Sequence, residues 1–155
     1  MSASESIEIS KAVADQLSAA SAAGTIGGFT FIARHAMLPR ITRESCLSLR
    51  VDTRPRGDVR IFGSRNRTQH DYQIEIAVRK AIETEDCLTA EELILVSEKI
   101  ADYWERTDSA TSQTRVLTGR DEKLVSPVEM QFSEETLQQH RIILATIILN
   151  FRGWR

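Results

Sequence analysis

Two stretches of the chain repeat apolar residues at helical spacing. In the first, from Ile7 to Ala23, the side chains of Ile9, Val13 and Leu17 fall on one face of a helix. Gly24 follows, and a glycine directly after a helix commonly ends it. The pattern therefore predicts a helix near the start of the chain.

A second helix is predicted from Thr89 to about Arg106. Thr89 and Glu92 have the spacing of a capping box, in which each side chain satisfies a backbone N–H at the helix start. The acidic residues at this end of the helix are expected to be solvated and favoured by the helix dipole. The predicted buried stripe consists of Leu93, Val96, Ile100 and Tyr103 or Trp104.

Most of the remaining apolar stretches indicate strands. Apolar and polar residues alternate over 47–51, 59–62, 72–79 and 128–132, which is the pattern of half-buried strands, and 116–117 is a candidate for a further short strand. The stretch from Ile142 to Phe151 is almost continuously apolar instead. Such a run predicts a central strand that is covered on both faces.

Two further segments are read from their composition. Phe29 and Phe31 begin an aromatic strand or extended arm around 27–41, which Pro39 interrupts. The stretch 63–69 is polar and turn-like, and we expect it to be a mobile loop.

The order of these elements predicts the fold class. A helix, two to four strands, a second helix and two or three strands form an α+β pattern. We expect a single domain over residues 1–155, with a largely antiparallel sheet of about five strands and two helices packed on one face. The sequence contains no internal repeat and no linker.

Charge is distributed unevenly along the chain, although the net charge is only −2. Residues 34–80 carry eleven basic and five acidic side chains, a net charge of +6. Residues 81–135 carry five basic and fourteen acidic side chains, a net charge of −9. This asymmetry has two interpretations: two surfaces that serve association, or two solvated faces with no further role.

Composition argues against a membrane or secreted protein. The chain has no apolar run of about 18 residues, and its first residues lack the basic and apolar regions of a signal peptide. Cys46 and Cys87 are far apart and without metal-binding spacing, so we expect two reduced, structural cysteines. These features predict a protein of the cytoplasm or of a virion assembled there.

No catalytic, cofactor or metal motif is present in the sequence. His35, His70 and His140 lack metal-ligand spacing, and there is no nucleophile elbow or phosphate-binding loop. The arginines between Arg54 and Arg67 could grip phosphates. However, an acidic chain without a basic recognition helix is a poor candidate for specific nucleic-acid binding.

Several segments resemble a group of small phage neck and tail proteins. The arm ends in Leu38-Pro39-Arg40, a strand like 71–76 follows, and an acidic helix from Glu91 to Trp104 comes next. The best match is the final apolar strand, which closes on Phe151 and Arg152. From about Val13 to its end, the chain resembles the tail terminator, or tail completion, proteins of long-tailed phages.

This resemblance implies a structural virion protein with neither catalysis nor cofactor. Such proteins form a ring, here expected to have six subunits, that caps the tail-tube protein and docks to head connector or neck proteins. DNA would pass through the ring without specific recognition. The alternatives are a head-completion, connector or tail-tube subunit, or a small binding module outside virions.

We expect the subunit and partner interfaces to use the apolar arm and the arginine-rich segment. A ring needs a heterologous interface, in which one patch meets a different patch of the neighbour. The candidate interface residues are Phe29, Phe31, Leu38, Arg54, Arg56, Arg60, Arg65 and Arg67.

Overall fold

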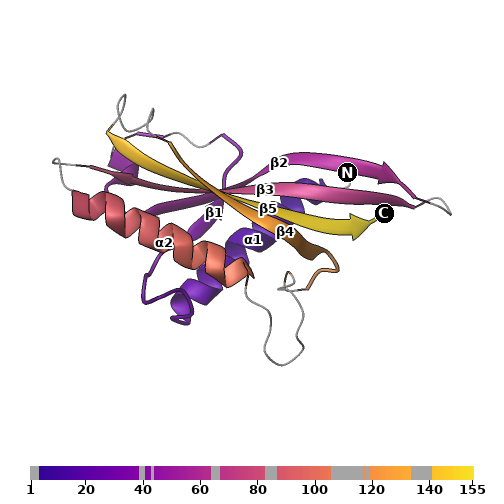
Figure 1. The fold of residues 1–155 in the computed structure, drawn as a ribbon, viewed down its shortest axis with the longest axis horizontal. Coiled ribbons are helices and arrows are strands. Elements are labelled where there is room, and N and C mark those ends of the chain that lie inside the picture. Colours follow the sequence, from indigo (N-terminus) through magenta and orange to yellow (C-terminus); the bar gives the residue numbers. More distant parts are fainter. Residues whose placement is uncertain are drawn as a thin grey trace.

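The computed structural model describes residues 4–38, 41–42, 44–63, 67–82, 87–105, 117, 119–133 and 141–155. Within these residues, two long helices and five strands form the fold (Figure 1). In chain order the elements are α1 (Glu5–Ala22), β1 (Ala33–His35), a 3-10 turn (Glu44–Cys46), β2 (Arg50–Phe62), β3 (Thr68–Ala81), α2 (Cys87–Glu105), β4 (Lys123–Ser133) and β5 (Ile142–Trp154).

The strands form one mixed, mostly antiparallel sheet in the order β1-β2-β3-β5-β4. Among the described strands, β1 and β2 are the one parallel pair of neighbours. Because β5 is antiparallel to both β3 and β4, those two strands run in the same direction with β5 between them. The predicted α+β class with a largely antiparallel sheet is confirmed.

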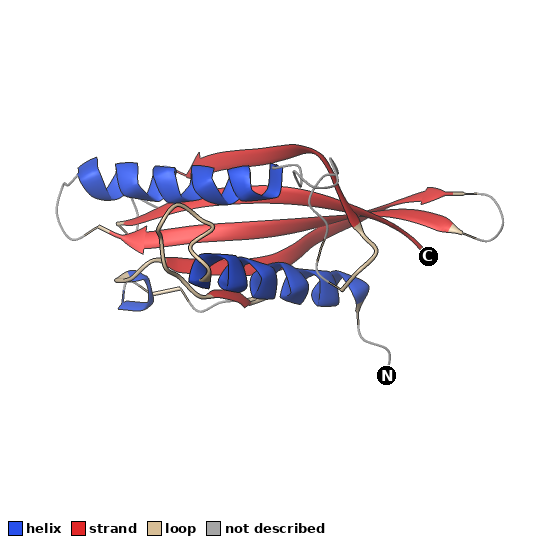
Figure 2. Ribbon diagram, turned by 90° about the horizontal axis from the view of Figure 1, so that it is seen from below, coloured by secondary structure: helices blue, strands red, loops and turns tan. Residues whose placement is uncertain are grey.

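Both helices lie side by side on the same face of the sheet (Figure 2). The Gln16 amide on α1 donates a hydrogen bond of 3.1 Å to the Tyr103 hydroxyl on α2. Alternate residues of β3 and β5 face this helical layer, which explains the alternation seen in the sequence. The largest fully buried side chains between the helices and the sheet include Ile9, Leu17, Ile74, Ile76, Leu93, Ile100, Trp104, Ile147, Leu149 and Phe151.

The other face of the sheet is only partly apolar. Near the 3-10 turn, Cys46, Ala81 and Ile142 form a small second cluster. Ile148 of β5 is also buried, so the apolar run of this interior strand packs on both faces. Among the described residues, no helix is long and apolar enough to cross a membrane.

Strand β2 is longer than the sequence pattern predicted. It runs without a break through Pro55 and Gly57, where a bulge shifts the register against β3. Proline is tolerated there because β1 ends opposite Thr53, so that β2 has a free edge beyond that point. The predicted strand 59–62 and the last two residues of the predicted strand 47–51 are therefore parts of one strand, whereas residues 47–49 precede it and are not in a strand.

Strand β4 and helix α2 also begin earlier than predicted. Strand β4 begins at Lys123, five residues before the predicted start. Helix α2 begins at Cys87, so Thr89 lies in its first turn rather than at its cap, and the predicted capping box is wrong. Residue 116, on which a short strand was proposed, lies outside the described residues.

Beyond the helices the sheet continues as a narrow projection (Figures 1 and 2). We call this projection the tongue and define it as residues 56–63, 67–71 and 152–155. Its strands pair in register, with Ile61 opposite Gln69 and Gln69 opposite Trp154. Most of the tongue lies outside the helix-covered core, so its exposed side chains are available to another molecule.

Candidate interaction surfaces

The aromatic arm is held against α1 by serine side chains. The Ala33 N–H donates to Ser18 Oγ at 2.9 Å, and Ser18 Oγ donates to the Ala33 carbonyl at 3.0 Å. Ser21 binds the arm in the same way. Its Oγ accepts a hydrogen bond from the Phe31 N–H at 2.9 Å and donates one to the Phe29 carbonyl at 3.0 Å. The hydroxyls thus replace a neighbouring strand along this edge.

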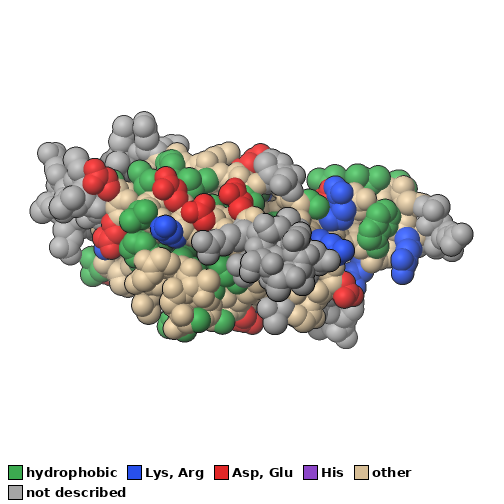
Figure 3. Space-filling model, turned by 60° about the horizontal axis from the view of Figure 1, so that its bottom comes forward, with side chains coloured by type: hydrophobic (Ala, Val, Ile, Leu, Met, Phe, Trp, Pro, Cys, Tyr) green, Lys and Arg blue, Asp and Glu red, His purple; other side chains and the backbone are tan. Residues whose placement is uncertain are grey.

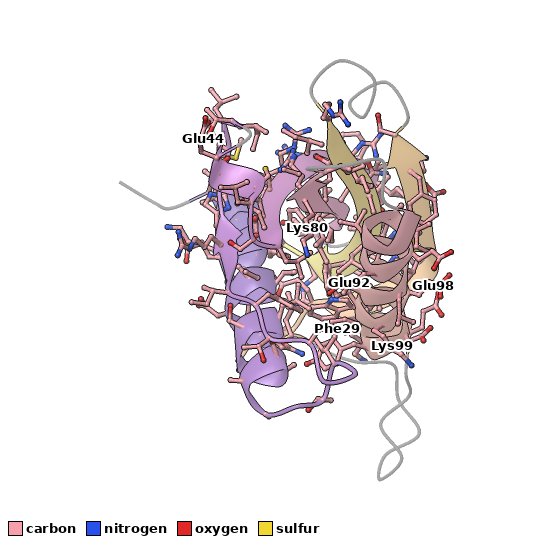
Figure 4. The ribbon with its side chains drawn as sticks, turned by 90° about the vertical axis from the view of Figure 1, so that its left-hand side faces the viewer. Phe29, Glu44, Lys80, Glu92, Glu98 and Lys99 are labelled. Carbon is pink, nitrogen blue, oxygen red and sulfur yellow. The ribbon has the colours of Figure 1, made fainter. Side chains whose placement is uncertain are left out.

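This attachment decides which arm residues are exposed. Phe31 is buried in the subunit's own core, and Phe29 packs between the two helices (Figure 4). Phe31 therefore offers nothing to a neighbour. Leu38, with 93% of its surface exposed, is the arm residue best placed for an external contact. Ile32 and Leu47 are also more than half exposed on this side of the molecule.

Ser10, His35 and Thr53 form a buried chain of hydrogen bonds beneath α1. Ser10 Oγ lies 2.7 Å from His35 Nδ1 and 3.1 Å from Thr53 Oγ1, while Thr53 Oγ1 donates to the Ser10 carbonyl at 2.9 Å. Each hydroxyl has one proton, so His35 Nδ1–H donates to Ser10, which in turn donates to Thr53. Ser10 is fully buried with its proton already committed, and the cluster joins α1 to the sheet rather than forming a nucleophile.

Two of the five arginines in the cluster are neutralised by acids of the same segment. Arg54 pairs with Glu75, and Arg60 Nε donates to Asp58 at 3.0 Å. Arg56 and Arg67 are exposed, without an ion-pair partner among the described residues, and Arg65 lies outside those residues. The part of the cluster that remains available to a neighbour is therefore smaller than the sequence suggested.

The tongue combines these arginines with exposed apolar side chains. The exposed fractions are 51% for Val59, 50% for Ile61, 92% for Phe62 and 52% for Trp154. Register places Val59, Ile61 and Trp154 on the face of the sheet opposite the helices. Large apolar side chains gathered on a projection, and rimmed by arginine, are typical of a protein–protein contact.

An ionic clamp centred on the buried Glu122 side chain holds the base of the tongue. Glu122 accepts hydrogen bonds from Arg120 Nε at 3.0 Å and from Arg155 Nη2 at 2.6 Å, and Glu5 of α1 accepts from both arginines. Burial alone would raise the pKa of Glu122, but the hydrogen bonds from Arg120 and Arg155 outweigh it and hold the pKa below its usual range. The clamp joins the start of α1, the segment before β4 and the end of β5.

Gly153 is part of the same arrangement. A β-carbon at this position would lie 3.1 Å from Glu122 Cγ, so a larger residue would press against the buried carboxylate side chain. Strand β4 begins opposite Arg152, and residues 153–155 have no strand beside them on that edge. A hollow of about 380 Å³ opens there, with Arg67, Lys123, Arg152 and Trp154 in its wall.

Helix α2 presents an acidic face to solvent. Glu91, Leu95, Glu98, Asp102 and Glu105 follow one another at spacings of three or four residues and are all exposed. Figure 4 shows Glu98 pointing away from the sheet, whereas Glu92 approaches Lys80 at 3.6 Å. Leu95 is 45% exposed among these carboxylates.

The charges therefore separate along the molecule. In Figure 3, acidic side chains gather over the helical body and basic side chains over the tongue. Within the described part of the chain, no three His, Cys, Asp or Glu side chains are placed to hold a metal ion. The surfaces found here are suited to binding protein rather than a small ligand.

Sequence reasoning identified some of these residues and missed others. The clamp residues Glu5, Arg120 and Glu122 were not predicted, because they meet only after the chain ends come together. Trp154 lies two residues beyond Arg152, on which the predicted final strand closes, and was not among the candidate interface residues. The serines carried a usable signal, since Ser10, Ser18 and Ser21 recur on one side of the first helix, next to an extended segment.

The fold is similar to that of a known virion protein. A chain in a structure titled "Virion of native gene transfer agent (GTA) particle" aligns with 96% of this chain and 98% of its own length, with a TM-score of 0.54 and 13% sequence identity. At this identity the likeness shows a shared fold. No protein-family model and no curated protein matches the sequence.

Proposed function

We propose that this chain is a structural virion protein of a phage-like particle, and that it acts as a tail terminator. The observation that carries the proposal is the fold shared almost end to end with a chain of a gene transfer agent virion. Coverage of 96% and 98% means that the two chains correspond over nearly their whole given lengths. The resemblance of the sequence to tail terminators adds the specific role.

The surfaces of the subunit support assembly into a ring. A closed ring joins one patch to a different patch on the next copy. The chain has two unlike surfaces of opposite charge, the tongue and the outer face of α2, and such complementarity sets the direction of assembly. We propose a ring of six subunits that caps the tail tube and offers its other side to the head connector.

The test is assembly with tail tubes built from the tail-tube protein of the same particle. Mass photometry measures the size of the purified protein, and negative-stain imaging shows where it binds. The expected result is a ring at one end of each tube, together with arrest of further tube growth. A protein that never caps a tube would contradict the terminator role. Incorporation along the whole tube would instead identify a tube subunit.

A further inference from the structure

We infer that the tongue of one subunit docks on the acidic outer face of α2 of a second copy of this chain. The inference deepens the proposed function, because it names the contact by which neighbouring subunits would join. It rests on charge and shape visible in one subunit. The partner is the same chain, and the contact runs head to tail.

On the tongue, the docking surface centres on Trp154. This side chain is half-exposed and stands beside Ile61 across the intervening strand β3. Arg67 and Lys123 border the same hollow as Trp154, and neither has an ion-pair partner among the described residues. Tryptophan and arginine are the residues most enriched among side chains that dominate binding energy at protein interfaces.

On α2, the matching surface centres on Leu95. It stands opposite the buried stripe of the helix, with Glu91, Glu98 and Asp102 one helical turn or two away. None of these three carboxylates has an ion-pair partner in the described part of the chain. An apolar centre with an acidic rim is thus available to meet an apolar centre with a basic rim.

The two surfaces belong to different copies for a geometric reason. The tongue projects past the helices, and the acidic side chains of α2 lie over the body of the molecule (Figure 3). Both are part of rigid secondary structure, since the tongue is a paired sheet and α2 is packed on the core. They therefore cannot fold onto one another, whereas a second copy brings them together without any conformational change.

Charge balance further favours a second copy. The described tongue carries five arginines and two aspartates, and the described helix carries five acidic residues and one lysine. Arg155 is already paired with Glu5 and Glu122, and Glu92 with Lys80, so charges of +2 and −3 remain. These nearly cancel when one tongue meets one helix. A nucleic acid could compete for the tongue but would be repelled by the helix, so it accounts for only one of the two surfaces.

The test uses two charge-reversed variants of the full chain. In the helix variant Glu98→Lys and Asp102→Lys reverse the rim of Leu95, and in the tongue variant Arg67→Glu and Lys123→Glu reverse the rim of Trp154. All four side chains are exposed, so each variant should fold normally, which circular dichroism and a thermal melt would verify. Each is expected to weaken self-association at least about tenfold, measured by mass photometry across a concentration series.

Mixing the two variants tests the head-to-tail arrangement. The helix variant has a reversed helix and an intact tongue, and the tongue variant has an intact helix and a reversed tongue. In the mixture, the intact tongue of the first can meet the intact helix of the second, and the reversed tongue of the second can meet the reversed helix of the first. The expected product is a mixed assembly of alternating variants, with association restored toward that of the original chain. A mixture that stays as weakly associated as its components would overturn the inference.

A matched control separates local effects from a general change in charge. Asp15→Lys places the same type of reversal on the exposed side of α1, away from both surfaces. This control should associate normally. If it weakens association as much as the helix variant does, the specific contact is refuted. Trp154→Ser, which removes the half-exposed apolar centre of the tongue surface, should also weaken association.

The outcomes distinguish this inference from the proposed function. Unchanged rings in the two charge-reversed variants, with tube capping intact, would refute the docking contact and leave the terminator role standing. Rings that respond as expected but never cap a tube would support the contact and refute the terminator role. Variants that form normal rings but lose tube binding would assign these surfaces to the tail tube and overturn the inference.

Discussion

Individual hydroxyl groups determine how α1 meets the sheet. Ser18 and Ser21 each donate one hydrogen bond and accept another, using backbone groups that would otherwise form an open strand edge. Ser10 links the same helix to His35 and Thr53. An alanine at any of these positions would fit the helix equally well, so the serines are explained by their contacts rather than by helix propensity.

His35 is expected to make stability dependent on pH. Burial lowers its pKa, Lys11 lowers it further, and Glu8 acts in the opposite direction. Because the folded pKa lies below the unfolded value, this contribution is present above about pH 6.5 and is lost as the pH falls through the folded pKa. Thermal melts from pH 8 to 5 should show less acid destabilisation for His35→Gln than for the original chain. Equal pH profiles would show that His35 contributes nothing to this dependence.

Trp104 is the largest fully buried side chain of the core. Its ring meets those of Tyr103 and Phe151 edge to face, at centroid distances of 5.2 and 5.8 Å. Replacement by alanine should cost about 3–5 kcal/mol in the free energy of unfolding, because it leaves a large cavity. Chemical denaturation of the Trp104→Ala variant measures this cost, and an unchanged midpoint would contradict the packing.

A phenylalanine at the same position provides the comparison. Trp104 Nε1 is buried and has no hydrogen-bond partner among the described residues, so the native side chain already carries a desolvation penalty. Trp104→Phe removes that unsatisfied donor while keeping an aromatic ring. We expect it to be clearly less destabilising than Trp104→Ala. An equal loss of stability in the two variants would show that keeping an aromatic ring at this position does not preserve the packing.

At the scale of elements, apolar periodicity in the sequence predicted the long and regular helices and strands. Helix α2 and strands β3 and β5 each carry an unbroken pattern, and all three were located from the sequence. Strand β2 was divided because Pro55 and Gly57 normally interrupt strands, and a local bulge is not visible in the sequence. Strand β1 has only three residues, too few for any period to appear.

The contact between α1 and the arm offers a test at this scale. Ser18→Ala and Ser21→Ala would each leave a backbone N–H and a carbonyl without their partner hydroxyl, at a cost of about 1–3 kcal/mol per site. The double variant should unfold at a lower denaturant concentration, and hydrogen exchange should rise at the Phe31 and Ala33 amides before it rises in β3. Ser4 is the N-cap residue of α1 but its side chain makes no capping hydrogen bond, so Ser4→Ala is a suitable control.

Protection that stays unchanged at Phe31 and Ala33 in the double variant would contradict this role. It would mean that burial of Phe31 alone keeps the arm in place. A uniform loss of protection across the sheet would instead show that the arm and the core open together, rather than as separate units.

At the scale of the whole molecule, the arrangement of charge was the least predictable feature. The sequence showed a basic segment and an acidic one, but not which charges would be satisfied internally. Asp52 forms ion pairs with both Arg50 and Arg79, at 2.8 and 3.1 Å. Asp71 pairs with Arg152, which lies near the far end of the chain. Only the folded sheet brings these partners together, and the charges left over define the candidate interface.

The clamp at the base of the tongue depends on the complete fold. Glu5, Arg120, Glu122 and Arg155 come from three separate parts of the sequence, and no local pattern connects them. Their contact fixes where the tongue leaves the body of the subunit. An assembly that uses the tongue against a neighbour requires this direction to be constant, so the clamp supports interface geometry as well as stability.

Glu122→Gln is therefore expected to have two effects. It removes the charge that Arg120 and Arg155 share, at a cost of about 1–3 kcal/mol, discounted because both arginines are partly exposed. The hydrogen bonds from these arginines hold the folded pKa of Glu122 below its usual range despite its burial. Its stabilising contribution is therefore present above about pH 4.5 and disappears as the pH falls through the folded pKa.

Stability measured between pH 7 and pH 3 should thus differ between the variant and the original chain at neutral pH and converge in acid. Glu8→Gln, on the same helix as Glu5 but outside the clamp, is the matched control and should follow the original chain closely. If Glu122→Gln keeps the same difference in stability at both ends of this range, the carboxylate charge is not what stabilises the base of the tongue. Self-association of the variant should also weaken at neutral pH, because a less firmly held tongue meets its neighbour in fewer productive orientations.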